Sequence, residues 1–420
     1  MGAGGDERPE WVPRSGRVLV LGLGETGRAA AAALVRVGAS VIAVDRSPTA
    51  DAGRLAEDGV EVRLGSEEES LLDGVELVVK GPGVPAESPL AAAARARGLE
   101  IWSEVELGYR LLDRTPILGV TGTKGKTTVV RLLGAMFEAA ERPYVLAGNE
   151  HRPLTDVVDE LEPGTWIVCE LSSFALEDVH AFACDIAVLL NIEPDHLDRY
   201  ASLDDYRAAK LRIFERARTK VVPRGMGLEG IEFSAGDPLP AELLLPGAHN
   251  RANAAAATSA ARAAGLPDEA IAVALQTFPG VEHRLELVGE LDAVRYVNDS
   301  KATTTSAARR AVAAYDAPIR LILGGSLKGE DYGPFARDLP SNVRSIYLIG
   351  EAADELAAAL DAAGRSYSRD DDLTRALAHA RGDAEPGDVV LLSPAAASFD
   401  QFANFRERGD TFRRLVGDLR

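Results

Sequence analysis

The chain has 420 residues, which predicts two or three domains, and its formal net charge of −19 argues against non-specific nucleic-acid binding. Its two cysteines, Cys169 and Cys184, do not indicate a disulfide framework, and no apolar run is long enough to span a bilayer. The polar residues 1–16 lack the apolar core of a signal peptide and predict a loose tail. We therefore expect a cytoplasmic protein with no membrane partner.

The N-terminal segment carries a glycine fingerprint. The apolar stretch RVLVLGLG leads into Gly22-x-Gly24-x-x-Gly27, an alanine-rich helix follows, and Asp45 ends the next apolar stretch. This pattern is typical of a Rossmann domain that lays the pyrophosphate of a dinucleotide on a helix N-terminus. A nicotinamide-dependent oxidoreductase is therefore one hypothesis.

Alternating strand and helix patterns continue along the chain in three segments. The first contains SVIAVD, VEVRLG and ELVVKGPG, the second PILGVTG, WIVCELSS and IAVLLNI, and the third RYVND, IRLILGG, SIYLIG and DVVLLSP. Such alternation predicts parallel sheets with helices on their faces. We expect an α/β protein with domains at residues 1–114, 115–280 and 281–420.

A second phosphate-binding pattern lies at residues 116–128, PILGVTGTKGKTT. A glycine-bearing turn between a strand and a helix points backbone N–H groups at phosphate oxygens. Lys126 would reach the β- and γ-phosphates, and the Thr127 hydroxyl would bind Mg²⁺. The strict P-loop spacing is not met, because Val120 stands where the first glycine should be. The alternative is an ordinary turn with an exposed lysine.

Two further residues suit phosphate chemistry. Glu170 ends the strand WIVCE, where a carboxylate could bind Mg²⁺ or could equally be a solvated loop acid. Lys210 is the single charge on an apolar helical stripe of positions 206, 209, 213, 214 and 217. Desolvation there would favour its neutral amine, unless the side chain extends out of the core edge.

Motifs spread over nearly the whole chain point to one family. They are, in chain order, GLGETGRA, GVTGTKGKTT, AGNEHRPL, ELSSFALE, NIEPDHLDRY, YRAAKLRIFE, LPGAHNRANAAAA, HRLE, NDSKATT, LGGSLKGEDY and LSPAAASFDQFANFRERG. Together they resemble the Mur ligase family of peptidoglycan synthesis. The resemblance implies a Rossmann-like first domain that binds the UDP of a sugar substrate, a central P-loop ATPase-like domain, and a Rossmann-like third domain that brings the amino acid.

The resemblance also implies a reaction. ATP would convert a carboxylate of UDP-N-acetylmuramoyl-L-alanine into an acyl phosphate, and the amine of glutamate would then displace phosphate, in a monomer that needs Mg²⁺. We expect D-glutamate as the acceptor. L-glutamate is the alternative, because Lys124 replaces the asparagine usual in the phosphate loop, as in a subgroup that adds the L-isomer.

Roles for individual residues follow from the same resemblance. Catalytic roles fall to Lys126, Glu170, His196, Lys210 and Lys301. Mg²⁺ would be held by Thr127 and Glu170, and a second Mg²⁺ by His196 and a carbamylated Lys210. ATP would contact Gly122, Thr123, Lys124, Gly125, Lys126, Thr127, Thr128, Asn253, Arg284 and Asp299. The UDP-sugar would contact Gly24, Glu25, Thr26, Arg46, Asn149, Ser172 and His196, and glutamate would contact Thr303, Lys328, Ser398, Phe399 and Phe405.

Purely structural roles stay open for several of these residues. Asn250, near Asn253, could be a simple helix N-cap, and Arg284 could form an interdomain salt bridge. Two other classes of function compete as well. A nicotinamide oxidoreductase leaves TGTKGKTT without a role, and a non-catalytic nucleotide-binding module leaves Lys210 unexplained.

Overall fold

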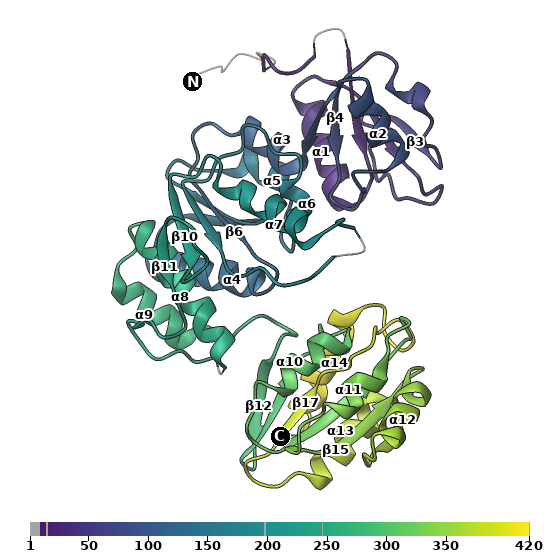
Figure 1. Ribbon diagram of the computed structural model, residues 1–420, viewed down its shortest axis with the longest axis vertical. Coiled ribbons are helices and arrows are strands. Elements are labelled where there is room, and N and C mark those ends of the chain that lie inside the picture. Colours follow the sequence, from purple (N-terminus) through teal and green to yellow (C-terminus); the bar gives the residue numbers. More distant parts are fainter. Residues whose placement is uncertain (1–8, 14–15, 197–198, 246, 420) are drawn as a thin grey trace. The chain divides into compact units, whose positions relative to one another are not determined.

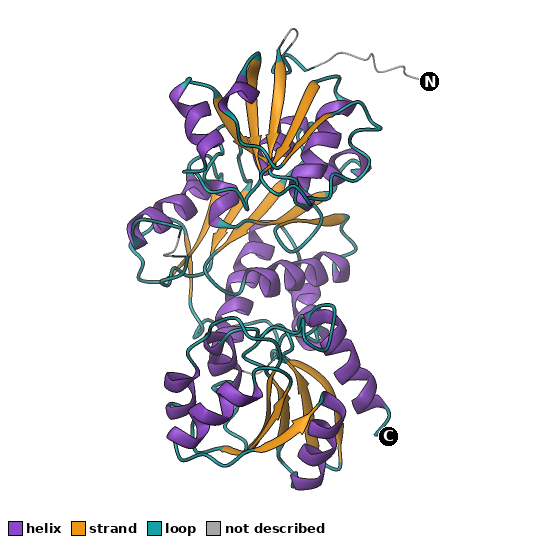
Figure 2. Ribbon diagram, turned by 90° about the vertical axis from the view of Figure 1, so that its right-hand side faces the viewer, coloured by secondary structure: helices purple, strands orange, loops and turns teal. Residues whose placement is uncertain are grey.

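The computed structural model describes residues 9–13, 16–196, 199–245 and 247–419 (Figure 1). The chain divides into two compact units, Met1–Glu242 with Ala252–Gln276 and Leu243–Arg251 with Thr277–Arg420. The first unit contains two sheets and the second contains one, each with its own helices (Figure 2). The expected three-domain α/β architecture is confirmed, while the boundaries at residues 114 and 280 stay a prediction.

The first sheet is parallel, with the strand order β3-β2-β1-β4-β5. Its elements are β1 (Arg17–Leu21), α1 (Glu25–Arg36), β2 (Ser40–Asp45), β3 (Glu61–Leu64), the 3-10 helix η1 (Glu69–Leu72), β4 (Val75–Lys80), α2 (Pro89–Ala96), β5 (Glu100–Ser103) and α3 (Glu104–Leu111). The central strands β1 and β4 are buried, which is why they are near-continuous apolar runs. The four predicted strands β1–β4 are confirmed; β5 was not predicted.

The middle sheet is also parallel, with the order β11-β10-β9-β6-β8-β7. Its elements are β6 (Ile117–Thr121), α4 (Lys126–Ala139), β7 (Tyr144–Gly148), α5 (Leu154–Val157), η2 (Val158–Glu160), β8 (Trp166–Glu170), α6 (Ser173–Leu176), β9 (Ile186–Leu189), α7 (Leu203–Leu211), η3 (Arg212–Phe214), β10 (Thr219–Pro223), β11 (Ile231–Phe233), α8 (Ala248–Ala263) and α9 (Asp268–Thr277). Strand β6 lies between β9 and β8. The loop that follows it is therefore at the centre of the carboxyl edge of the sheet.

The third sheet has the order β12-β13-β17-β14-β15-β16. Its elements are β12 (Glu286–Leu291), β13 (Val294–Asn298), α10 (Thr305–Val312), β14 (Ile319–Gly324), α11 (Tyr332–Arg337), β15 (Val343–Ile349), α12 (Ala353–Ala362), β16 (Ser368–Asp371), α13 (Leu373–Asp383), β17 (Val389–Leu392) and α14 (Phe405–Gly417). The expected open α/β sheet is confirmed, with one difference. Strand β12 is antiparallel to β13, joined through Asp292 and Ala293, which have φ of 52° and 59°.

The N-terminal tail corrects one expectation. Residues 1–8 and 14–15 of the predicted loose tail lie outside the described residues. Within residues 9–13, however, Val12 is buried and the ring of Trp11 packs on Trp102, with centroids 5.3 Å apart. Trp11 also packs against the apolar core of the first sheet, which includes Trp102 of β5. This part of the tail is therefore not loose. Among the described residues, no helix combines the length and apolarity needed to cross a membrane.

Buried charges connect the two sheets of the first unit. The Lys80 ammonium, at the end of β4, lies 3.4 Å from Glu177 and 3.2 Å from Asp178, and its side chain is 1% exposed. The Glu106 carboxylate, on α3, accepts hydrogen bonds from the backbone N–H groups of residues 180–182. These hydrogen bonds keep the Glu106 pKa below its ordinary value, although burial opposes them. The first two domains are thereby held as one body.

Candidate active site

In the glycine turn of the first sheet, the backbone of Gly22 lies directly against that of Gly27. Gly22 has a φ of 89°, and a Cβ on Gly27 would lie 1.8 Å from the Gly22 carbonyl oxygen, so α1 can start here only with glycine. The Asp45 carboxylate accepts hydrogen bonds from the N–H groups of Leu23 (2.7 Å) and Ser47 (2.8 Å). In a dinucleotide-binding domain, an acid at this position would bind the ribose. Here the Asp45 carboxylate instead ties the glycine turn to the end of β2. Gly24, Glu25 and Thr26 form the start of α1, and Arg46 is exposed.

The second phosphate-binding loop lies between β6 and α4. Gly125 precedes the helix with a φ of 87°, in the left-handed region that glycine adopts without strain. The Lys126 ammonium folds back over this loop and donates to the carbonyl oxygens of Gly122 (2.9 Å) and Thr123 (3.0 Å). Thr127 and Thr128 are buried at the first turn of α4. The loop and its lysine thus form the compact cationic cradle that a phosphate chain requires.

Two neighbouring segments support this loop. The Lys124 N–H donates to the Asn191 side chain (2.9 Å), and the Lys124 ammonium is paired with Glu193. From α8, the Asn253 amide reaches the loop so closely that a Cβ on Gly125 would lie 2.4 Å from its oxygen. Asn253 therefore lies against the phosphate loop, and its contact with ATP stays a prediction. The capping interpretation of Asn250 is wrong, because Asn250 is the third residue of α8 and not the residue before it.

Glu170 lies beside the phosphate loop because β8 pairs with β6, in a register that places Val120 opposite Glu170. Burial raises the pKa of its carboxyl, and the nearby Lys126 charge and a hydrogen bond with Thr127 act in the opposite direction. Its Oε2 atom is buried and has no hydrogen-bond partner in the described part of the chain. A buried acceptor of this kind next to a threonine hydroxyl fits a Mg²⁺ ion, whose other ligands would be phosphate oxygens and water.

The described residues contain no cluster of three or more His, Cys, Asp or Glu side chains that could hold a metal by themselves.

Lys210 projects from α7 into the same region. Its side chain is 1% exposed, its ammonium donates to the Gly122 carbonyl oxygen (2.9 Å), and it lies 4.6 Å from the centre of the Tyr206 ring. Burial, with a contribution from the Lys126 charge, lowers the pKa of Lys210 to about 7. The predicted apolar stripe therefore faces inward, and the alternative of a lysine extending to solvent is wrong.

His196 lies in the segment that follows β9. It has a φ of 52°, is about half-exposed, and packs its ring on Phe174 at 4.8 Å and on Tyr206 at 6.2 Å between centroids. Tyr206 therefore contacts both His196 and Lys210. Of the other expected sugar ligands, Asn149 is exposed and lies 3.5 Å from Glu170, and the Ser172 hydroxyl caps α6.

The second unit gathers the expected amino-acid ligands at the carboxyl ends of β13, β14 and β17. The Lys328 ammonium lies 3.4 Å from the Thr303 hydroxyl, Ser398 is buried, and Phe399 is 71% exposed. The loops that carry Lys328 and Ser398 are joined by the Phe399 N–H, which donates to the Ser326 hydroxyl (2.9 Å). A cation beside hydroxyl groups suits a carboxylate ligand.

Asp299 and its neighbours lie close by in the same unit. Burial raises the pKa of Asp299 to about 7, although Ser393 donates to it at 2.8 Å. The Lys301 ammonium lies 5.3 Å from the Phe405 ring, and the Arg284 Nε atom is buried without a hydrogen-bond partner among the described residues. These groups leave a buried acid and a cation at the carboxyl end of β13.

Sequence reasoning missed three residues that organise these loops. Arg408, on α14, is fully buried and donates to the carbonyl oxygens of Ser300, Ala396 and Ala397. The sequence feature that could have identified Arg408 is its position in the motif QFANFRERG. The other two are His151, beside Glu170, and Arg199.

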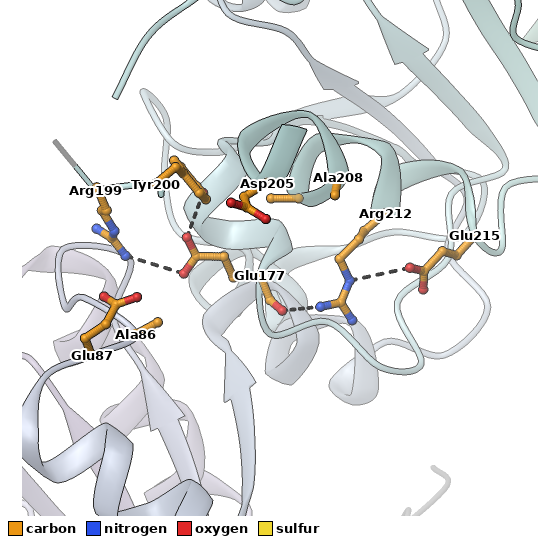
Figure 3. A pocket seen from close by; sticks show the side chains of 10 residues that line it. Ala86, Glu87, Glu177, Arg199, Tyr200, Asp205, Ala208, Arg212 and Glu215 are labelled. Atoms are coloured by element: carbon orange, nitrogen blue, oxygen red, sulfur yellow. Dashed lines mark hydrogen bonds and ion pairs between the residues drawn. The ribbon is translucent and has the colours of Figure 1, made fainter. Parts of the chain in front are cut away.

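Arg199 lines a pocket of about 530 Å³ in the first unit (Figure 3). The pocket is lined by Ala86, Glu87, Glu177, Arg199, Tyr200, Asp205, Ala208, Ala209, Arg212 and Glu215. Four acids face two arginines there, and both arginines already have partners, Arg199 with Glu177 (3.5 Å) and Arg212 with Glu215 (3.5 Å). Such a lining does not suit a pyrophosphate.

Comparison with known proteins defines the class. Residues 16–103 match the MurD-like N-terminal domain of Mur ligases, residues 120–227 the Mur ligase middle domain, and residues 283–396 the Mur ligase glutamate ligase domain. The chain belongs to the Mur ligase family, as its motifs predicted.

Individual relatives narrow the comparison. The protein named UDP-N-acetylmuramoylalanine–D-glutamate ligase from Caldanaerobacter subterraneus subsp. tengcongensis is 40% identical over 96% of this chain and 98% of its own length. The protein of the same name from Acidobacterium capsulatum is 40% identical over 95% and 96%.

Solved structures show the same fold. UDP-N-acetylmuramate-alanine ligase MurC from Thermotoga maritima has a TM-score of 0.56 at 18% identity, covering 96% of this chain and all of that one. FolC from E. coli has a TM-score of 0.55 at 19% identity, covering 80% of this chain and all of that one.

Proposed function

We propose that this protein is an ATP-dependent ligase that adds D-glutamate to UDP-N-acetylmuramoyl-L-alanine in peptidoglycan precursor synthesis. The observation that carries the proposal is the meeting of Lys126, Glu170 and Lys210 at the carboxyl edge of one parallel sheet. Relatives of nearly equal length, 37–40% identical, bear the name of this activity. We further propose domains at residues 1–114, 115–280 and 281–420, and a cytoplasmic monomer.

The chemistry begins with a poor electrophile. A carboxylate forms an amide only after it has gained a leaving group, and transfer of the γ-phosphoryl group of ATP onto it supplies one. Phosphoryl transfer depends mainly on positioning and on neutralising charge. The loop N–H groups and the Lys126 ammonium would hold the phosphates in line with the acceptor. Mg²⁺, held by Thr127 and Glu170, would neutralise phosphate charge.

In this proposal Lys210 acts as a carbamate. An amine whose pKa is about 7 is largely neutral at physiological pH, and a neutral amine can react with CO₂ to form a carbamate. The carbamate would help to hold a second Mg²⁺ together with His196, and the side chains of both residues contact Tyr206. The buried position of the amine, 2.9 Å from the phosphate loop, supports this role.

The acceptor amino acid would bind in the second unit. Thr303, Lys328 and Ser398 provide a cation and two hydroxyls for the side-chain carboxylate of glutamate, and Phe399 and Phe405 provide apolar contacts. Arg284, Asp299 and Lys301 would meet ATP and the reacting groups. The names of the relatives favour the D-isomer over the L-isomer.

One assay tests the proposal. Purified protein would receive ATP, Mg²⁺, UDP-N-acetylmuramoyl-L-alanine and either glutamate enantiomer, and phosphate release would be followed together with the mass of the product. We expect release with D-glutamate. Release with the L-isomer alone would overturn the stereochemistry, and no release with either would overturn the ligase. A nicotinamide enzyme would instead change the absorbance of NADH without ATP.

A variant tests the carbamate. Lys210→Ala should lose ligase activity that added bicarbonate does not restore, whereas short carboxylic acids should restore part of it by replacing the missing anion. Unchanged turnover of Lys210→Ala would contradict the carbamate role.

A further inference from the structure

A tight turn holds His151 against the end of β8. Within the turn, the Gly148 N–H donates to the Arg152 carbonyl oxygen (2.8 Å), and the His151 N–H donates to the Gly148 carbonyl oxygen (2.9 Å). The Asn149 N–H donates to the carbonyl oxygen of Glu170 (3.0 Å), at the end of β8. Gly148 has a φ of 93°, and a Cβ on it would lie 2.1 Å from the Glu170 carbonyl oxygen. The turn is therefore closed on itself and packed directly on the backbone of Glu170.

This turn brings an imidazole to the carboxylate. The His151 Nε2 atom lies 3.7 Å from Glu170 Oε2, and the two side chains are 8% and 1% exposed. The other carboxylate oxygen faces the Asn149 amide, 3.5 Å away. The nitrogen and the oxygen thus face one another in a buried setting, on the side of the carboxylate that accepts no hydrogen bond in the described part of the chain.

The separation distinguishes two roles for the imidazole. A direct N–H···O hydrogen bond spans about 2.7–3.2 Å, which is shorter than the observed distance. Two donor atoms that bind one octahedral cation, each at about 2.1 Å, lie roughly 3.0 Å apart when adjacent and roughly 4.2 Å apart when opposite. The observed 3.7 Å lies between these two separations, so a shift of less than about 1 Å brings both atoms onto one cation.

We propose that His151 is a nitrogen ligand of the divalent cation that Glu170 and Thr127 hold. The inference rests on the proposed function, because that function places a cation there. Oxygen ligands alone suit Mg²⁺, whereas an imidazole favours transition-metal ions. His151 therefore raises the affinity of this site for Mn²⁺ relative to Mg²⁺.

The test uses the full chain with Mn²⁺ and a non-hydrolysable ATP analogue. Pulsed electron paramagnetic resonance detects the coupling of Mn²⁺ to a directly bound ¹⁴N nucleus. His196→Ala is the background, because it removes the other imidazole expected near a metal. We expect the ¹⁴N coupling in His196→Ala and its loss in the double variant His196→Ala/His151→Ala. Coupling that persists in the double variant would overturn the proposal.

Binding constants give a second readout. Removing His151 should weaken Mn²⁺ binding by at least about tenfold and Mg²⁺ binding by clearly less. Equal losses for both ions would mean that His151 only orients Glu170, and would overturn the ligand role. His151→Gln keeps the size and polarity of the side chain if His151→Ala does not fold, which thermal unfolding without metal checks.

The two proposals fail in different ways. A His196→Ala variant that binds Mn²⁺ and nucleotide without ¹⁴N coupling contradicts only the role of His151. A parent protein that binds neither contradicts both the role of His151 and the proposed function. Glu170→Gln should abolish the ¹⁴N coupling of Mn²⁺, since it removes the anionic ligand on which the site depends.

Discussion

Lys210 shares a helical stripe with Tyr206, Ala209, Ile213 and Phe214, all of them buried, and its amine lies over the Tyr206 ring. Desolvation makes its charged form costly, and the Lys126 ammonium adds repulsion. The folded chain therefore releases this proton near pH 7, while the unfolded chain keeps it to about pH 10. Between these limits unfolding takes up a proton, so the contribution of Lys210 to the free energy of unfolding becomes more favourable as pH rises.

Lys210→Met removes this titration. Relative to the variant, the parent should gain stability from pH 7 to pH 9 by up to about 1.4 kcal/mol per pH unit. Urea unfolding in CO₂-free buffer measures the difference without interference from carbamylation. Parallel stability profiles for the two proteins would show that the buried amine does not titrate in this range.

The phosphate loop depends on the conformation of Gly125. Alanine there would be strained at a φ of 87°, and its Cβ would meet the Asn253 amide at 2.4 Å. Gly125→Ala should weaken binding of a non-hydrolysable ATP analogue by at least about tenfold, since either the loop or Asn253 must move. Gly164, with the same φ of 87° and no heavy atom within 4 Å of its Cβ, is the matched control. Gly164→Ala should cost about 1 kcal/mol of stability and leave binding unchanged.

The segment that carries His196 is fixed to the first sheet through Arg199. Its guanidinium donates to the carbonyl oxygens of Pro82 (2.7 Å) and Val84 (2.9 Å), which follow β4, and lies 3.9 Å above the Phe174 ring. In Figure 3, the same Glu177 side chain receives both Arg199 and the Tyr200 hydroxyl, which donates at 2.6 Å. Movement of the loop after β4 is therefore coupled to the position of His196.

Arg199→Lys keeps the charge and loses the fork of donors. We expect the KM for UDP-N-acetylmuramoyl-L-alanine to rise about tenfold and the KM for ATP to stay unchanged, because the loop after β4 belongs to the domain that we propose binds the UDP-sugar. Arg216→Lys, at an exposed arginine paired with Glu215, is the control. A rise in both KM values, or in neither, would contradict the coupling.

At the scale of the whole molecule, the first two domains share buried ion pairs. Lys80 is the fully buried cation of Glu177 and Asp178, and its loss would leave them only their more exposed partners Arg199 and Arg95. Lys80→Met should therefore destabilise the chain by about 2–3 kcal/mol, because the carboxylates stay partly paired. Arg97→Met is the control, because its pairs with Glu69 and Asp73 are largely exposed and contribute little to stability.

Urea unfolding followed by tryptophan fluorescence measures both variants of this pair. Trp11 and Trp102 report on the first sheet, and Trp166 reports on the middle one. If Lys80→Met were no less stable than Arg97→Met, the buried pairs would not hold the two domains together.

Much of this protein followed from its sequence, because the relevant signals are local. Strands β1, β4, β6, β8 and β9 are continuous apolar runs, as buried parallel strands must be, and glycines mark both phosphate-type turns. The inward-facing stripe around Lys210 was visible as a helical period within a dozen residues. The family followed from the order of the motifs.

The tertiary structure alone decided the contacts between residues that are distant along the chain. The hairpin β12–β13 turns on two residues of positive φ, of which Asp292 is a usual turn residue but Ala293 is not, and Trp11 packs on Trp102 of β5. Lys80 meets Glu177, and His151 meets Glu170, only because strand order brings their segments together. Sequence patterns record which face of an element is apolar, whereas the pairing of charged and metal-binding side chains depends on the packing of the whole sheet.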